Sequence, residues 1–206
     1  MRVAILGCSI LALAACGGAK TENNTAETKP AGPCAEVEMI MAAKSDAEPF
    51  QSLRGENVML GERALEDKWT AKVSSFDGRC EINAMRGFFG EPTDIHTYGC
   101  VLFEAGNFDR EENEVKARAM LEDIETTLIS CLGDNWTVEE TTEKRDFDVY
   151  RKLKFVQTDA PETDAKFTAD ALYAEMSFTP FMRGRGGKSG WDVHVQFQEM
   201  VDTSGD

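Results

Sequence analysis

Basic residues and histidines are scarce in this sequence. Its 22 lysines and arginines stand against 37 aspartates and glutamates, so the formal net charge is −15, and the only histidines are His96 and His194. An acidic chain is repelled by nucleic acid and by anionic lipid headgroups, so we expect no nucleic-acid partner and a preference for cationic partners. Any mechanism that depends on histidine would have to use one of these two residues.

Sequence motifs of common enzymes and metal sites are also missing. There is no GxSxG or HExxH motif, and no pair of cysteines has the CxxC spacing. The alternation around His194 predicts a solvated position beside Asp192, whereas His96 is expected to be partly buried at the rim of a sheet. We therefore predict no catalytic residues, no metal and no cofactor, although residues distant in the sequence can converge in a fold.

An acidic segment, 109–114, suggests calcium binding at first sight but has a simpler interpretation. It lacks the glycine that a calcium-binding loop carries at its sixth position. Carboxylates are favoured at the start of a helix by the helix dipole, and Asp109 with Glu112 has the spacing of a capping box. The segment is therefore predicted to begin a helix.

A glycine-rich segment, 183–190, partly matches a phosphate-binding loop. Gly187-Lys188-Ser189 matches its end, but Met182 occupies the place of the first glycine and the residues that follow alternate as a strand. We interpret the segment as a hairpin loop. Its cations are unusual in so acidic a chain and are candidate contacts with an anionic group of a partner or with the protein's own acidic face; they are Arg183, Arg185 and Lys188.

The first sixteen residues carry the most specific signal in the sequence. A basic residue precedes the apolar run Val3–Leu13, which is shorter than the roughly 20 residues that a membrane-spanning helix needs. The following stretch, Leu13-Ala14-Ala15-Cys16, resembles the lipobox of bacterial lipoproteins. The resemblance implies that residues 1–15 are a signal peptide and that Cys16 carries palmitate-type acyl chains. The alternative is an ordinary signal peptide, with Cys16 incidental.

The residues after this stretch predict a membrane anchor followed by a tether. Two or three acyl chains hold a protein stably in a bilayer, so the membrane is an expected partner. Gly17 stands where an inner-membrane retention signal usually has aspartate, which favours the outer membrane with the domain in the periplasm. Residues 16–33 are polar or small and are expected to form a flexible tether. Residues 34–206 are long enough for one globular domain.

Four cysteines remain in the predicted mature domain, and an even number in an oxidising compartment predicts two disulfides. Three pairings are possible. Strand register favours Cys80 with Cys100, because directly opposed residues of antiparallel strands lie within reach of a disulfide. By elimination Cys34 pairs with Cys131, which would join the start of one helix to the end of the other.

Hydrophobic periodicity predicts an α+β fold in which antiparallel sheet of about six or seven strands packs against two main helices. The expected order is helix, three strands, helix, four strands. The first helix should begin at Cys34, and Gly55 should turn the chain. A hairpin around Asp77-Gly78 should set Phe76 opposite Arg79. The expected later strands are His96–Glu104, Trp136–Thr141, Phe147–Thr158, Thr168–Met182 and Trp191–Glu199.

These observations favour a membrane-anchored envelope lipoprotein whose domain is a non-enzymatic binding or accessory module. An envelope protein is the expected partner. Phe88 and Phe89, between two glycines in a loop, are further candidate contacts for it, although such a pair can also pack beneath its own loop. The alternative is an extracytoplasmic, hydrolase-like enzyme whose acidic residues converge in a cleft.

Overall fold

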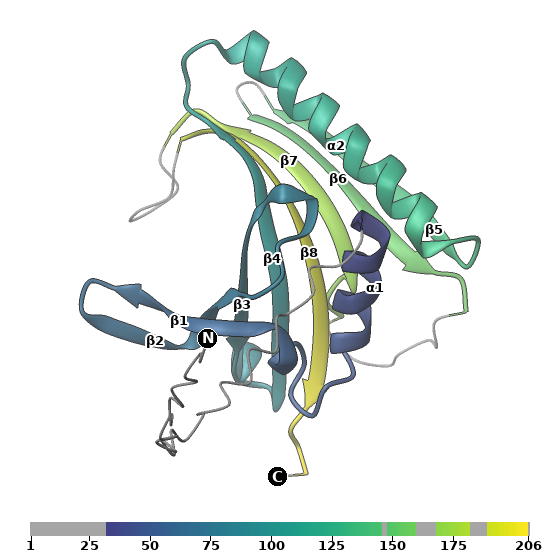
Figure 1. Ribbon diagram of the computed structural model, residues 1–206. Helices are drawn as coiled ribbons and strands as arrows, with labels where there is room; N and C mark the ends of the chain where they lie inside the picture. The colour runs from purple at the N-terminus through teal and green to yellow at the C-terminus, as the bar shows by residue number, and fades with distance from the viewer. Residues whose placement is uncertain (1–31, 146–147, 160–167, 182–188, 206) are drawn as a thin grey trace, which may run out of the picture.

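The fold joins one sheet to two helices. The computed structural model describes residues 32–145, 148–159, 168–181 and 189–205. Among them, eight antiparallel strands form a single sheet and two α-helices pack against it (Figure 1). The predicted α+β class is confirmed. The predicted count of six or seven strands is wrong, and the order is helix, four strands, helix, four strands.

Each half of the described chain is a helix followed by a meander of four strands. The helices and strands, in chain order, are α1 (Pro33–Ala43), β1 (Arg54–Leu60), β2 (Arg63–Ala71), β3 (Arg79–Met85), β4 (Thr93–Ala105), α2 (Arg110–Leu132), β5 (Trp136–Arg145), β6 (Asp148–Gln157), β7 (Leu172–Thr179) and β8 (Gly190–Asp202). Three short 3₁₀ turns are η1 (Gln51–Leu53), η2 (Ser75–Asp77) and η3 (Phe88–Gly90). The strand order is β1-β2-β3-β4-β8-β7-β6-β5, so the two meanders meet where β4 pairs with β8.

The strand that the sequence did not reveal is β1. Gly55 lies inside it rather than at a turn, and its pairing with β2 is interrupted by two register shifts. Most of its side chains are exposed or half-buried, so no hydrophobic alternation marks it. An edge strand of this kind is held mainly by backbone hydrogen bonds, which the sequence does not display.

The predicted two-residue hairpin between β2 and β3 is also wrong. Trp69, not Val73, lies opposite Ile82, so β2 ends earlier and the connection contains η2. A type I′ turn needs positive φ at both central residues, but Gly78 has φ −82°. Positive φ occurs one residue earlier, at Phe76 (53°) and Asp77 (54°). The longer loop therefore places Phe76 near the helices.

The predicted register of the next pair is confirmed. Cys80 lies opposite Cys100 and Ile82 opposite Tyr98. A disulfide joins Cys80 to Cys100, and a second joins Cys34 to Cys131. The second bond connects the N-terminal turn of α1 to the C-terminal turn of α2, so it ties the two helices together.

The ends of the helices follow local sequence signals only in part. Pro33 occupies the first position of α1, where its missing N–H costs nothing, and Gly133 ends α2 with φ 76°. The predicted capping box at the start of α2 is wrong. Asp109 is in the left-handed region with φ 54° and its side chain makes no capping bond. Neither described helix combines the length and hydropathy that a membrane-spanning helix requires.

The two faces of the sheet differ in polarity. One face packs against the helices and forms the core, in which Leu121 and Ile124 of α2 and Ile40 of α1 are fully buried. Strand residues of alternate positions complete this core, among them Ile82, Tyr98, Leu153, Ala174, Met176, Val193, Val195 and Phe197. The other face carries polar side chains, for example Tyr173, Glu175, Asp192 and His194. The helices therefore shape any pocket on the first face.

Candidate ligand pocket between the two helices

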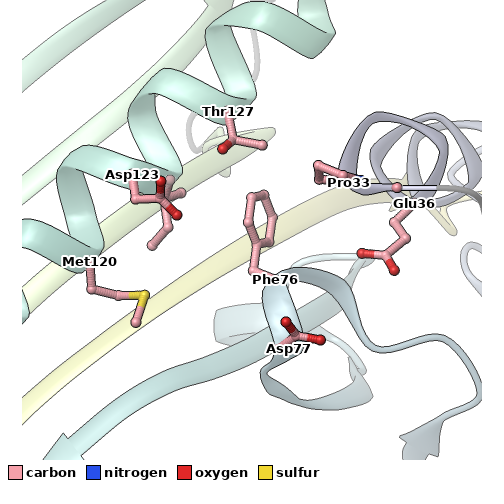
Figure 2. Close-up of a pocket in the computed structure, with 9 residues that line it drawn as sticks. Pro33, Glu36, Phe76, Asp77, Met120, Asp123 and Thr127 are labelled. Carbon is pink, nitrogen blue, oxygen red and sulfur yellow. The ribbon is translucent and has the colours of Figure 1, made fainter.

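A pocket of about 470 Å³ lies where the start of α1, the η2 loop and the middle of α2 meet (Figure 2). This volume is in the range of small-molecule sites. The pocket is lined by Gly32, Pro33, Glu36, Phe76, Asp77, Met120, Asp123, Ile124 and Thr127. None of these nine residues is basic, and three of them are acidic. The pocket therefore combines apolar surface with uncompensated negative charge.

Phe76 occupies the centre of this arrangement. Figure 2 shows its ring between the two helices, with Glu36 on the side of α1 and Asp123 on the side of α2. The ring reaches this position because both Phe76 and Asp77 adopt the left-handed conformation, which is uncommon for residues other than glycine. The surrounding contacts hold the loop: Ser75 is fully buried beside Cys100, and the Tyr98 hydroxyl donates to the Val73 carbonyl at 2.6 Å.

Glu36 is the most unusual residue of the pocket. Only 7% of it is exposed, yet its carboxylate makes no hydrogen bond or ion pair with any of the described residues. Its charge has an electrostatic effect on Tyr98, whose pKa is raised to about 12, first by burial and in smaller part by Glu36. The carboxylate oxygens are not themselves enclosed, because the fully buried side-chain polar atoms without a partner in the described ranges are Arg54 Nε and His96 Nδ1. The residue is largely covered, while its carboxylate opens to the pocket. Glu36 is thus positioned for a partner that a ligand could supply.

The two other carboxylates stand at the exposed side of the pocket. Asp77 and Asp123 are both exposed, and within the described ranges neither forms an ion pair. They come from the η2 loop and from α2, whereas Glu36 comes from α1. The three carboxylates do not form a metal site, since no group of three potential ligands close enough to hold a metal ion exists in the part of the chain that the structure describes.

A second cluster of charges, below α1, is organised differently. Glu48 accepts a hydrogen bond from Arg54 at 2.7 Å and another from Arg86, and Arg86 also binds Asp94 at 2.8 Å. The pKa of Glu48 is lowered to about 2, mainly by the hydrogen bond from Arg54. The hydrogen bond from Arg86 lowers the pKa of the Asp94 carboxyl, and the same hydrogen bond raises the pKa of Arg86. We name the set of Glu48, Arg54, Arg86, Asp94 and Asp67 the arginine cluster.

His96 lies beside the arginine cluster and is more deeply buried than predicted. It is 1% exposed, its Nδ1 has no hydrogen-bond partner, and this atom is 3.9 Å from Glu48 Oε1. Its pKa is lowered, chiefly by burial and next by the charge of Arg86. His96 is therefore a neutral core residue without access to a substrate in solvent.

His194 is on the polar face of the sheet, as predicted, but it is less solvated than expected. Its Nδ1 is 2.7 Å from Asp192 Oδ1, its side chain is 18% exposed, and its ring meets Tyr173 edge to face. The two histidines thus lie on opposite faces of the sheet. No single site can use both.

The other predicted contact residues are only partly described. Phe88 is half-buried in η3, and nothing is described of the Phe89 side chain. Cys16, Arg183, Arg185 and Lys188 lie outside the described residues. Their roles in lipidation and partner binding stay predictions.

Sequence reasoning missed the pocket because its residues carry no motif. The sequence predicts Phe76 at the end of a strand and Asp77 in a tight turn, and Asp123 is an ordinary exposed position of a helix. One signal was available. Glu36 lies one turn before Ile40 and beside Val37, so a charged residue falls on the buried face of a predicted helix.

Comparisons with known proteins add no family to this geometry. No protein-family model matches the chain, and no curated protein or solved structure matches it either. The function must therefore be inferred from the residues and the geometry themselves.

Proposed function

We propose that the protein is a lipid-anchored binding protein of the bacterial cell envelope, non-enzymatic, whose ligand or envelope partner occupies the pocket between α1 and α2. The observation that carries this proposal is Glu36, a residue only 7% exposed whose carboxylate opens to the pocket and has no partner among the described residues. A bound ligand can supply the partner that the fold does not. The pocket's size suits such a ligand.

The cellular location is proposed from Leu13-Ala14-Ala15-Cys16 and from the two disulfides. Disulfides persist in oxidising compartments such as the periplasm, which agrees with export. Acylated Cys16 would anchor the chain in the outer membrane, and residues 17–32 would link the anchor to the domain in the periplasm. Metabolic labelling with a radioactive fatty acid tests this. Cys16→Ser should abolish the label, and an equally labelled variant would exclude the anchor.

The binding role is tested by crosslinking from inside the pocket in intact cells. A photo-reactive phenylalanine analogue replaces Thr127, which lines the pocket, and in a control protein it replaces the neighbouring Thr126, which is exposed on the same helix. A product captured from position 127 and not from 126 supports the proposal. Equal products from both positions, or none from 127, would exclude the pocket as the binding site.

Two further sets of contacts are proposed for a protein partner: the aromatic pair Phe88 and Phe89, and, separately, the cations Arg183, Arg185 and Lys188. The aromatic pair supplies apolar area and the cations supply attraction to an anionic group. Replacing both phenylalanines with alanine should remove the partner's crosslink to the anchored protein. An unchanged crosslink would exclude the aromatic pair.

One observation favours an alternative, a hydrolase-like enzyme: carboxylates from three different segments face one pocket. Paired carboxylates can act as acid and base in hydrolysis. The purified protein would be assayed on isolated cell-wall polymer and on chromogenic esters and glycosides. Hydrolysis that is lost in Glu36→Gln and retained in Glu38→Gln, on the exposed side of α1, would establish the enzyme.

A further inference from the structure

We infer that the pocket binds a primary ammonium group carried on an aliphatic chain, as in a polyamine or a lysine side chain. This inference rests on the proposed function, which makes the pocket a ligand site, and it names the chemistry of the ligand. The first argument is charge. Glu36, Asp77 and Asp123 face the pocket with no basic residue among those that line it. A cationic ligand group would neutralise the carboxylate of Glu36, which opens to the pocket from a largely buried residue.

The second argument is the contrast with the rest of the fold. The buried or half-buried carboxylates of the arginine cluster each have an arginine partner, at 2.7 Å for Glu48 and 2.8 Å for Asp94. Glu36 is 7% exposed, comparable to Asp94 at 8%, and has no such partner among the described residues. The same chain thus pairs one buried carboxylate and leaves another facing a pocket.

The third argument is the Phe76 ring, which distinguishes an organic cation from a metal ion. An ammonium group is attracted to the face of an aromatic ring, and the attraction grows when water is excluded. Figure 2 shows the Phe76 ring between Glu36 and Asp123. A cation beside this ring would therefore be attracted by the negative charge of both carboxylates. A metal ion would require closely grouped ligands, and no such group is found among the described residues.

The fourth argument is the apolar lining. Met120 of α2 and the ring of Phe76 supply apolar surface to the pocket. These side chains favour contact with the methylene groups of an aliphatic chain. The thioether of Met120 adapts to ligands of different shape. A ligand with an ammonium head and an aliphatic chain therefore fits both the charged and the apolar parts of the pocket.

Calorimetric titration of the full-length lipidated protein in non-ionic detergent tests the inference. The probes are spermidine and a short alanine peptide with one central lysine. Their controls are a neutral diol of similar length and the same peptide with acetylated lysine. Saturable binding of spermidine alone, or of both, identifies a free amine as ligand. Binding of the lysine peptide alone identifies a protein side chain. Absence of binding by both probes would overturn the inference.

Variants distinguish the pocket from general attraction to an acidic surface. Glu36→Gln should weaken binding by at least about tenfold, because it removes the negative charge of this residue but keeps its shape. Glu38→Gln on the exposed side of the same helix removes the same charge and should leave binding unchanged. Phe76→Leu, which keeps apolar volume without the ring, should weaken binding severalfold. Circular dichroism verifies that each variant is folded.

The outcomes separate this inference from the proposed function. Equal weakening in Glu36→Gln and Glu38→Gln would show non-specific attraction and overturn the inference. If neither amine binds while the photo-reactive residue at position 127 captures a product, the ligand is of another class and only the inference fails. If nothing is captured at position 127 and neither amine binds, the proposed function fails with it.

Discussion

The arginine cluster and the pocket both contain carboxylates beside α1. The carboxylates of the cluster are paired with arginines, whereas those of the pocket have no basic residue among the lining residues. In the arginine cluster, Arg54 and Arg86 bind Glu48 and Asp94 directly, and the carboxylate pKa values are lowered. In the pocket, Glu36 is about as buried as Asp94, and none of the lining residues is basic. The paired charges of the arginine cluster stabilise the fold. Charges without a partner are typical of a surface that meets something else.

The largest expected effect on the free energy of unfolding comes from removing the disulfide that joins the two helices beside the pocket. Cys34→Ala with Cys131→Ala removes the disulfide between residues separated by 97 positions. For a loop of this length, the chain-entropy model predicts a loss of about 4 to 5 kcal/mol in the free energy of unfolding. Urea denaturation of the two proteins measures it. A loss below about 1 kcal/mol would show that the helices hold together without the bond.

Breaking the arginine cluster should have the next largest effect. Arg54 is 11% exposed, binds Glu48 and stacks 3.9 Å from the centre of the Trp69 ring. Arg54→Met keeps the aliphatic stem but leaves Glu48 with a single arginine, and we expect a loss of about 3 kcal/mol in unfolding free energy. Arg79→Met is the matched control, because Arg79 is 63% exposed and, among the described residues, pairs with Glu104 alone. It should cost at most about 0.5 kcal/mol. Equal losses would contradict the distinction.

The pH dependence of stability should reveal the arginine cluster selectively. The pKa of Glu48 is about 2 in the folded protein and near 4.5 ordinarily, so the unfolded chain takes up the proton first. Glu48 therefore stabilises the fold above pH 4.5, and this stabilisation is lost as the pH falls towards 2. Glu48→Gln should reduce the loss over this window by on the order of 2 kcal/mol, given partial exposure of the carboxylate.

Denaturation curves at several pH values between 7 and 2 measure this effect. Glu38→Gln is the control, because Glu38 is exposed and should leave the pH dependence unchanged. His96 adds a separate effect at higher pH. Its pKa is lowered in the folded state, so its contribution is present above pH 6.5 and is lost as the pH falls below that value. An identical slope in Glu48→Gln and in the unaltered protein between pH 4.5 and 2 would contradict the role of Glu48.

The smallest expected effect is that of changing Glu36, the largely buried carboxylate residue of the pocket, on the stability of the ligand-free protein. Without ligand, Glu36→Gln removes the charge of a largely buried residue that has no counterion among the described residues, so stability should stay the same or rise by up to about 1 kcal/mol. Thermal unfolding of the two proteins in amine-free buffer measures it. A loss above about 1 kcal/mol would show that Glu36 is already paired within the fold.

Much of the sheet could be predicted because its buried strands alternate. Val193, Val195 and Phe197 of β8 show the period of two without interruption, and the β3–β4 register follows once Cys80 is placed opposite Cys100. The edge strand β1 has no such pattern, since few of its side chains are buried. Its existence depends on backbone pairing with β2, which hydrophobicity does not report.

The candidate site could not be predicted in the same way. Its residues come from α1, the η2 loop and α2, and they meet only because the loop between β2 and β3 is longer than a two-residue turn. Asp77-Gly78 has the composition of a tight turn, and tertiary contacts of Val73 and Ser75 overrode that local preference. Convergence of this kind depends on the whole fold and leaves no spacing in the sequence.

The edges of the sheet determine how this protein behaves when many copies share a surface. β1 is short and its pairing is irregular, while β5 at the opposite edge has exposed glutamates at positions 139, 140 and 143. Charged side chains along β5 disfavour pairing with a further strand, and β1 offers no regular template for one. Crowded copies of the domain would therefore stay separate instead of polymerising along the edges of their sheets.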